Sequence, residues 1–154
     1  MSTLRKDLKQ SRDFESIEQE TLLNMLRTAG HVAGPFDRMF KEHQLSQPLY
    51  NVLRILRGQQ GEGLACSHIG DRMVTRVPDV TRLIDKLIKL GLASRERSAT
   101  DRRVVLISIT SRGQALLAKL DGPTTELHQT ILGHMSAREL KELNRLLVKA
   151  RSNA

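Results

Sequence analysis

The sequence predicts a mainly α-helical fold that carries one small β-hairpin. Over most of the 154 residues, apolar side chains recur at steps of three and four, which is the period of an amphipathic helix. One stretch departs from this period. Residues 92–97 and 103–109 have strand character, the second being rich in β-branched side chains, and a polar, charged turn at 98–102 joins them. An apolar fraction of 39% and a charged fraction of 27% fit a folded chain.

The charge balance narrows the classes of partner. Lys and Arg number 25 against 17 Asp and Glu, a formal net charge of +8, which favours nucleic acid or an anionic membrane surface. Three Phe, one Tyr and no Trp argue against a single-strand binder that stacks bases on aromatic rings. No apolar run suits a bilayer span or a signal peptide. We therefore expect one soluble, cytoplasmic domain, residues 1–154.

The N-terminal third is expected to form one long helix. Residues 1–13 are polar and read as a loose arm or the fraying start of that helix. Apolar side chains then recur at helical spacing from Ile17 to Phe40. Gly34-Pro35 predicts a kink there, because proline lacks a backbone N–H and clashes with the preceding turn.

A second helix is expected from Ser46 to Gly58. Ser46 can cap its first turn, and Pro48 is tolerated there because the first N–H groups of a helix have no intrahelical partner. The glycine-rich loop 59–63 follows it. Its predicted buried face consists of Leu49, Val52, Leu53 and Leu56.

A short helix over 65–73 and a longer helix follow that loop. Thr75 is expected to cap the longer helix, which runs to Leu90 and stops at Gly91-Leu92. Pro78 then falls in its first turn, where proline fits, and Asp79 suits the positive helix end.

Two further helices are expected after the hairpin. Thr110 caps the first of them, and Gly122-Pro123 should bend it. The run Ser136-Ala137-Arg138-Glu139 is a capping box that starts the second.

The order helix, short helix, tight turn, helix and β-hairpin is that of a winged helix-turn-helix. In this fold the second helix of the pair enters the DNA major groove, and its early residues reach base edges. With Val80, Ile84 and Leu87 turned inward, the opposite face at about 100° per residue carries Arg82 and Asp85. The residues expected to contact DNA are Ser67, His68, Thr75, Arg76, Pro78, Asp79, Thr81, Arg82, Lys86, Arg102 and Arg103.

These residues differ in the contact expected of them. Arg82 could bind guanine through two hydrogen bonds or could hold a phosphate. Ser67 and Thr75 suit phosphate contacts. Asp79 could accept from cytosine, although stabilising the helix start is the favoured role. The hairpin tip, with Arg102 and Arg103, would meet the minor groove.

At this wing the chain resembles the MarR family of transcriptional regulators. Wings of that family carry Asp-x-Arg, five residues, Leu-Thr, two residues and Gly. The matching residues here, with Ile in place of Leu, are Asp101, Arg103, Ile109, Thr110 and Gly113. The blocks 67–73 and 80–87 resemble the two helices of its helix-turn-helix, and the resemblance covers about residues 15–150.

The resemblance implies an obligate homodimer in which N- and C-terminal helices of both chains interlace. Residues 46–112 would then form the DNA-binding lobe, and 14–45 with 113–152 the dimerisation lobe. It implies that Asp101 organises nearby arginines rather than touching DNA. It also implies a small aromatic acid or similar effector in the crevice between the lobes, for which the candidate contacts are His31, Arg38 and Tyr50.

The sequence thus predicts a sequence-specific regulator of double-stranded DNA, most simply a repressor, bound as a homodimer to a pseudo-palindrome and released by an effector. The alternative is a winged-helix adaptor whose basic face meets an acidic protein. No nucleophile elbow, phosphate loop or spaced carboxylate pair indicates an enzyme, so no catalytic residue or cofactor is expected. Basic residues spread along the chain give little support to membrane-surface binding.

The single cysteine and the five histidines leave two side questions. Cys66 starts the short helix, and a half-buried packing role is favoured over a thiolate helped by the helix N-terminus. One cysteine excludes an intrachain disulfide and a multi-cysteine metal site. The histidines are scattered with no i, i+4 pair, so no metal is expected.

Overall fold

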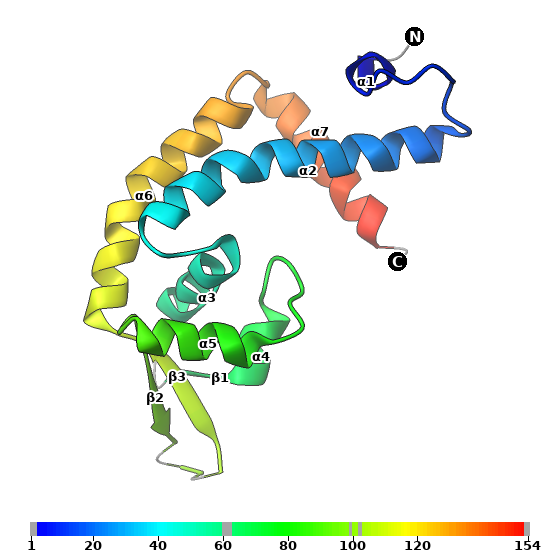
Figure 1. The fold of residues 1–154 in the computed structure, drawn as a ribbon. Coiled ribbons are helices and arrows are strands. Elements are labelled where there is room, and N and C mark those ends of the chain that lie inside the picture. Colours follow the sequence, from blue (N-terminus) through cyan, green and yellow to red (C-terminus); the bar gives the residue numbers. More distant parts are fainter. Residues whose placement is uncertain (1–2, 60–62, 99, 102, 153–154) are drawn as a thin grey trace.

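The computed structural model describes residues 3–59, 63–98, 100–101 and 103–152 of the chain (Figure 1). The hairpin projects from one end of the molecule, and both chain ends lie away from it (Figure 1). The elements in chain order are α1 (Thr3–Asp7), α2 (Ile17–Glu42), α3 (Gln47–Gly58), β1 (Leu64–Ala65), α4 (Cys66–Asp71), α5 (Val80–Lys89), β2 (Ala93–Arg97), β3 (Val105–Ile109), α6 (Ser111–Leu132) and α7 (Ala137–Arg151).

Helix α3 supplies the centre of the core. Its four predicted apolar residues are all buried, which confirms the face read from their spacing. Each fully buried leucine or isoleucine contributes about 1.5–3 kcal/mol relative to an exposed one, so these contacts fix where α5, the sheet and α6 lie on α3. The core residues that pack with α3 from those elements are Ile84, Leu87, Ile107, Leu117 and Leu120.

The predicted hairpin is confirmed, with strands shorter than expected. Strands β2 and β3 are antiparallel, and β1 pairs with the other edge of β3 to give the order β1-β3-β2. At the entrance to β1, Gly63 has φ +98°, and a Cβ there would lie 2.7 Å from the carbonyl oxygen of Ile107. Only glycine fits this approach, because a side chain would clash with the neighbouring strand.

The N-terminal residues differ from the expected loose arm. Residues 3–7 form the separate helix α1, and Leu4 is buried. The guanidinium of Arg5 explains this order, since it pairs with Asp13 and donates to the carbonyl oxygens of Gln10 and Ser11. One side chain thereby ties the end of α1 to the segment that leads into α2.

Both internal prolines lie inside continuous helices. Helix α2 passes through Pro35 without a break, so the expected kink does not divide it. Helix α6 likewise continues through Pro123, and Figure 1 shows that α6 changes direction along its length, as Gly122-Pro123 predicts. Helices α2 and α6 lie side by side.

The start of α5 corrects the sequence prediction. The helix begins at Val80, and its N-cap is Asp79, whose carboxylate accepts from the backbone N–H of Arg82 at 2.9 Å. Thr75 is therefore not the cap, and Pro78 precedes the helix instead of lying in its first turn. An aspartate next to the helix competes better for the role than a threonine four residues earlier, because the cap must reach the N–H groups of the first turn.

Of the three other predicted N-caps, two make the expected side-chain hydrogen bond and one does not. Thr110 caps α6 by accepting from the backbone N–H of Gly113 at 3.1 Å. Ser136 and Glu139 form the predicted capping box of α7. Ser46 occupies the N-cap position of α3, but its side chain makes no cap hydrogen bond.

Among the described residues, no helix combines the length and the apolar character that crossing a bilayer needs. No group of three or more His, Cys, Asp or Glu side chains within the described part of the chain could hold a metal ion.

Candidate DNA-binding surface

Helix α5 turns one face to the core and the other to solvent. Ile84 and Leu87 are buried against α3 and the sheet, as the helical wheel predicted. The opposite side chains, Thr81, Arg82 and Lys86, are exposed. Packing thus fixes the helix while its polar side chains stay free to meet a ligand.

A side-chain hydrogen bond from α3 holds the segment between α4 and α5. The side-chain oxygen of Asn51 accepts from the backbone N–H of Val74 at 2.8 Å. Thr75, Arg76 and Pro78 follow in this segment and are exposed, just ahead of the first turn of α5. Asn51 was not singled out from the sequence, because an Asn within an amphipathic helix gives no sign of a partner 23 residues away.

Helix α4 places two further predicted residues beside α5. Ser67 and His68 are exposed. Cys66 is half-buried, and its Sγ lies 3.5 Å from Oγ1 of Thr81 on α5. This agrees with a packing role for the cysteine and joins the two helices at their solvent edge.

Asp101 organises the backbone of the hairpin tip. Its carboxylate accepts from the backbone N–H of Arg103 at 2.9 Å, and its carbonyl oxygen accepts from the N–H of Val104 at 2.9 Å. The buried hydroxyl of Ser98 accepts from the N–H of Thr100 at 3.2 Å. Arg103 is exposed on this turn.

Arg102 lies outside the described residues, so its predicted DNA contact rests on the sequence. The resemblance implied that Asp101 acts on arginine side chains, whereas the bonds found among the described residues go to backbone groups.

An ion pair connects the hairpin to α5. Nη2 of Arg95, on β2, donates to Oδ1 of Asp85, on α5, at 2.7 Å. The sequence placed Asp85 on the outer face of the helix but gave no partner for it, since a strand register is needed to bring Arg95 close.

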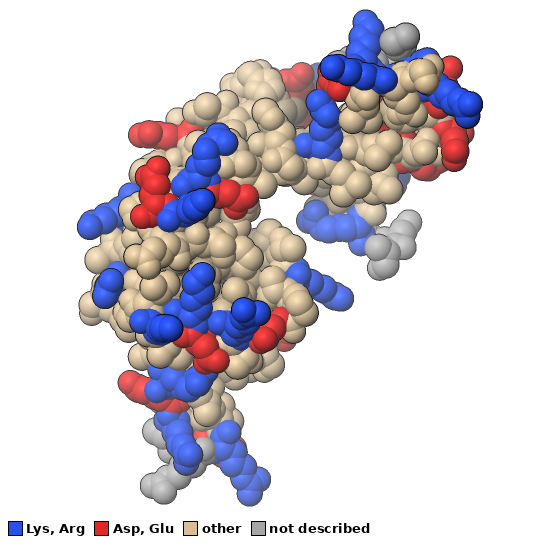
Figure 2. Space-filling view, viewed as in Figure 1, with Lys and Arg blue, Asp and Glu red and all other residues tan. Residues whose placement is uncertain are grey.

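Charge on this half of the molecule is mixed but rich in cations. Figure 2 shows Lys and Arg side chains along the hairpin and over the neighbouring helices, with Asp and Glu between them. Cations on a surface built from a helix and a hairpin suit a polyanion, because each phosphate contact releases a counterion.

The predicted effector residues are not brought together by contacts in the described structure. Tyr50 is half-buried, its ring stacks on Phe40 at 4.3 Å between centroids, and its hydroxyl accepts from Arg54 at 3.2 Å. His31 and Arg38 are exposed on α2.

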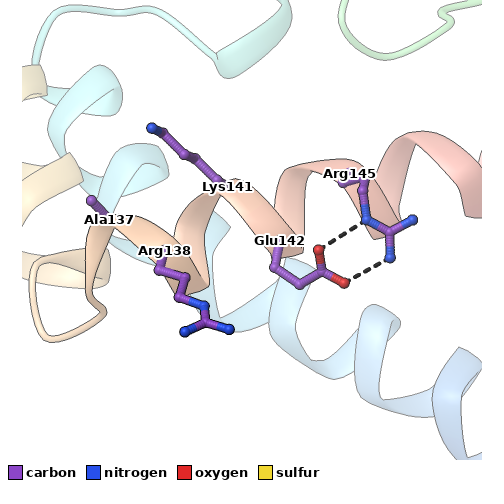
Figure 3. Close-up of a pocket in the computed structure, with 5 residues that line it drawn as sticks. All are labelled: Ala137, Arg138, Lys141, Glu142 and Arg145. Atoms are coloured by element: carbon purple, nitrogen blue, oxygen red, sulfur yellow. Dashed lines mark hydrogen bonds and ion pairs between the residues drawn. The ribbon is translucent and has the colours of Figure 1, made fainter.

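The pocket shown in Figure 3 lies elsewhere, on α7. Glu142 and Arg145 form a two-point ion pair within it, at 2.7 and 2.9 Å, and the guanidinium lowers the pKa of Glu142 below its usual value. None of the predicted effector residues lines this pocket. Its lining residues are Ala137, Arg138, Lys141, Glu142 and Arg145.

Large apolar side chains remain uncovered far from the hairpin. Ile17 and Leu26 on α2 are 69% and 61% exposed, and Leu146 on α7 is 46% exposed. None of the α7 residues is buried. Monomeric proteins seldom leave apolar helix faces this open, so a partner is expected to cover them.

The fold is similar to that of known regulators. A family model described as the transcriptional regulator SarA/Rot matches residues 36–120, more than half of the chain. The crystal structure of a MarR transcription factor from Planctomyces limnophilus is 41% identical, with a TM-score of 0.67. That match covers 88% of this chain and 98% of the other.

Two solved structures of lower identity share the fold. S. aureus MepR, solved in complex with DNA, is 22% identical, with a TM-score of 0.77 over 92% of this chain and 100% of that one. BpsR from Bordetella bronchiseptica, whose DNA binding is regulated by 6-hydroxynicotinic acid, is 21% identical, with a TM-score of 0.77 over 92% and 99%. The family model and the 41% identical structure confirm the resemblance that the wing residues predicted.

Proposed function

The chain belongs to the MarR-type family of winged helix-turn-helix transcription regulators, and on that premise we propose that it represses transcription as a homodimer on a pseudo-palindromic operator. The observation that carries the proposal is the exposed polar face of α5, held by the core and flanked by a basic hairpin. Members of this family are regulators rather than enzymes. We infer that this chain also acts by binding DNA and not by catalysing a reaction, and that it does so in the cytoplasm.

Each element has its own role on the duplex in this proposal. Thr81, Arg82 and Lys86 on α5 enter the major groove, since recognition helices insert their early residues. Thr75, Arg76 and Pro78 follow the groove edge ahead of the helix. Ser67 and His68 contact phosphates. Arg102 and Arg103, on the hairpin, contact the minor groove. Asp79 serves the helix start, as its hydrogen bond to Arg82 supports.

A second copy of the chain would cover the exposed apolar faces of α2 and α7. Residues 14–45 and 113–152 then form the dimerisation lobe, and 46–112 the DNA-binding lobe. A two-fold axis between the two copies of the chain would present their α5 helices to successive major grooves, about 34 Å apart.

A small effector is proposed to release the operator. The Bordetella relative supports this, since an aromatic acid regulates its DNA binding. The effector must bind the DNA-competent and the released states with different affinity, or it shifts nothing. Tyr50, together with His31 and Arg38, remains the candidate contact set for an aromatic acid on this chain.

Selection of bound fragments from a random duplex library at about physiological salt tests the proposal. We expect enrichment of a pseudo-palindrome with half-sites about one helical turn apart. Binding that shows no sequence preference and vanishes as salt rises would favour the adaptor, whose basic face meets an acidic protein.

A further inference from the structure

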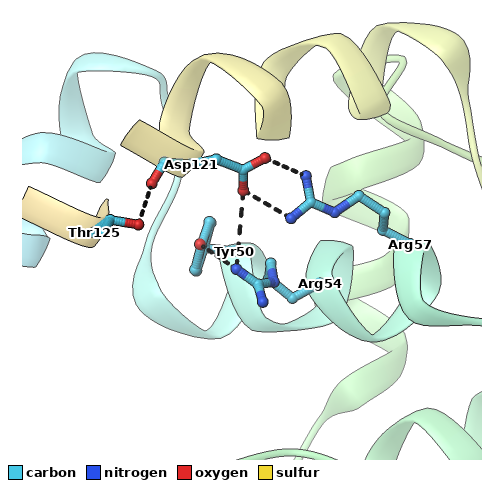
Figure 4. Close-up of polar contacts among 5 residues, drawn as sticks. All are labelled: Tyr50, Arg54, Arg57, Asp121 and Thr125. Carbon is cyan, nitrogen blue, oxygen red and sulfur yellow. Dashed lines mark hydrogen bonds and ion pairs between the residues drawn. The ribbon is translucent and has the colours of Figure 1, made fainter. Parts of the chain in front are cut away.

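A two-point ion pair joins α3 to α6 beneath the winged helix. Nη1 and Nη2 of Arg57 donate to the two carboxylate oxygens of Asp121 at 2.8 and 2.7 Å, across 64 residues of sequence (Figure 4). Parallel hydrogen bonds between a guanidinium and a carboxylate fix direction as well as distance. The pair thus adds a directional restraint to the apolar contacts that place α6 on α3.

A second arginine extends this contact toward α2. Nη1 of Arg54 lies 4.0 Å from Asp121 Oδ1 and also donates to the hydroxyl of Tyr50 (Figure 4). The ring of Tyr50 stacks on Phe40, in α2. Asp121, on α6, is therefore linked directly to α3 and, through Arg54 and Tyr50, to α2.

Asp121 lies where α6 leaves the core. Leu117 and Leu120, just before it, are buried with α3 and α5, whereas no described α6 residue after Thr124 is buried. Pro123 has no N–H to donate to the carbonyl of Lys119, so the helix lacks a backbone hydrogen bond beside Asp121. Helices bend most easily at such a point.

We propose that Asp121, held by Arg57 and Arg54, is a positioning residue for DNA binding, because it fixes the direction in which α6 leaves the winged-helix unit. The inference rests on the proposed homodimer. In a two-fold dimer, a change of direction at Asp121 moves both recognition helices relative to the axis. The ion pair thus determines which spacing of operator half-sites fits.

The test compares operators that differ only in the spacer between identical half-sites. Duplexes carrying the selected spacer, or that spacer lengthened or shortened by one base pair, are titrated with Asp121→Asn and with unmodified protein. Asn keeps the shape of Asp and loses its charge. Because the pair is partly exposed, we expect the preference for the selected spacer to fall by about two- to fivefold in the variant.

A charge-matched control separates positioning from net charge. Glu126→Gln removes one negative charge from the same helix, at an exposed residue with no ion pair among the described residues, and should keep the spacer preference. Arg57→Gln should reproduce the effect of Asp121→Asn. The double variant should lose no more than either single variant, since both remove the same contact.

A distance measurement reads the same property without DNA. A spin label at Lys89→Cys, in a Cys66→Ser background, reports the separation of the two α5 helices in the dimer. We expect a broader or shifted distribution with Asp121→Asn. An unchanged distribution together with an unchanged spacer preference would overturn the inference, even if thermal stability fell. If the unmodified protein binds all spacers alike, the proposed dimeric binding itself is wrong.

Discussion

Arg95 on β2 holds Asp85 on α5 through a 2.7 Å ion pair, so the hairpin and the proposed recognition helix are fastened to each other. Both side chains are about half-exposed, and such pairs contribute little to folding. Their effect is geometric. The pair restrains the angle between the hairpin and α5, and in the proposed complex this restraint lets the two elements meet adjacent grooves together.

Asp85→Asn is therefore expected to lower specificity more than affinity. Loss of one negative charge near DNA raises binding to any duplex, whereas a hairpin freed from α5 fits the operator less well. The ratio of operator affinity to scrambled-duplex affinity should fall, measured by fluorescence anisotropy over a range of salt. Asp71→Asn, at an exposed carboxylate of α4, removes the same charge and should keep that ratio.

Arg82→Ala is expected to relax base preference at one position of each half-site. Arg82 is exposed near the start of α5, where a recognition helix reaches base edges. A lost two-point contact to guanine costs roughly 1–3 kcal/mol of discrimination. Titration of operators with single base changes measures it. Lys89→Ala, at the far end of the helix, is the control.

A phosphate contact by Arg82, in place of a base contact, would give a different result in the same titrations. A loss of affinity that is uniform across base changes, with the salt dependence reduced by about one phosphate contact, would assign Arg82 to the backbone instead.

Local patterns predicted the fold where neighbours in sequence decide it. The buried face of α3 follows from leucines at steps of three and four, and the capping box Ser136–Glu139 closes within one turn. The sequence did not predict strand β1, because two residues show no alternation and pair only with a strand some 40 residues later. It did not predict the ion pair Arg57–Asp121 either, because the two residues lie 64 positions apart in the sequence.

The start of α5 shows how two local signals can compete. Thr75 and Asp79 are both good caps, and Asp79 takes the role because its carboxylate reaches the backbone N–H of Arg82 in the first turn. Predicted DNA contacts on α5 itself kept their place on the exposed face. Thr75, which was predicted as the N-cap, lies with Arg76 and Pro78 in the segment ahead of the helix.

Asp79→Ala is expected to destabilise the protein by about 1 kcal/mol, the usual cost of losing an N-cap. The carboxylate satisfies the backbone N–H of Arg82, and alanine cannot. The midpoint of urea unfolding measures the change, and Asp79→Ser should recover most of it. Unchanged stability with altered base preference would make Asp79 a DNA contact rather than a cap.

Leu146→Glu is expected to turn the homodimer into monomers. Leu146 is an exposed leucine on a helix without buried residues, and a carboxylate there would have to be desolvated when a partner covers it. Sedimentation equilibrium measures the shift, and operator affinity should fall with it. Lys141→Glu adds a carboxylate on the other side of α7 and should leave the dimer intact. A Leu146→Glu protein that stays dimeric would place the interface elsewhere.

Acid is expected to erase the contribution of the Asp121 ion pair to stability. Hydrogen bonds from Arg57 lower the pKa of Asp121 below its ordinary value of 3.8. A carboxyl whose folded pKa is depressed stabilises the fold above the unfolded pKa, and this stabilisation is lost as the pH falls through the folded pKa. Because Asp121 is 45% exposed, we expect less than about 1 kcal/mol at neutral pH.

Urea unfolding of the unmodified protein and of Asp121→Asn at a series of pH values measures that contribution. The unmodified protein should be the more stable at neutral pH, and the difference should shrink toward zero once the pH lies well below 3.8. Arg57→Gln should show the same convergence, since it removes the group that lowers the pKa. A difference that persists undiminished in acid would mean that the ionised carboxylate of Asp121 is not the source of the stabilisation, and the ion-pair explanation would be wrong.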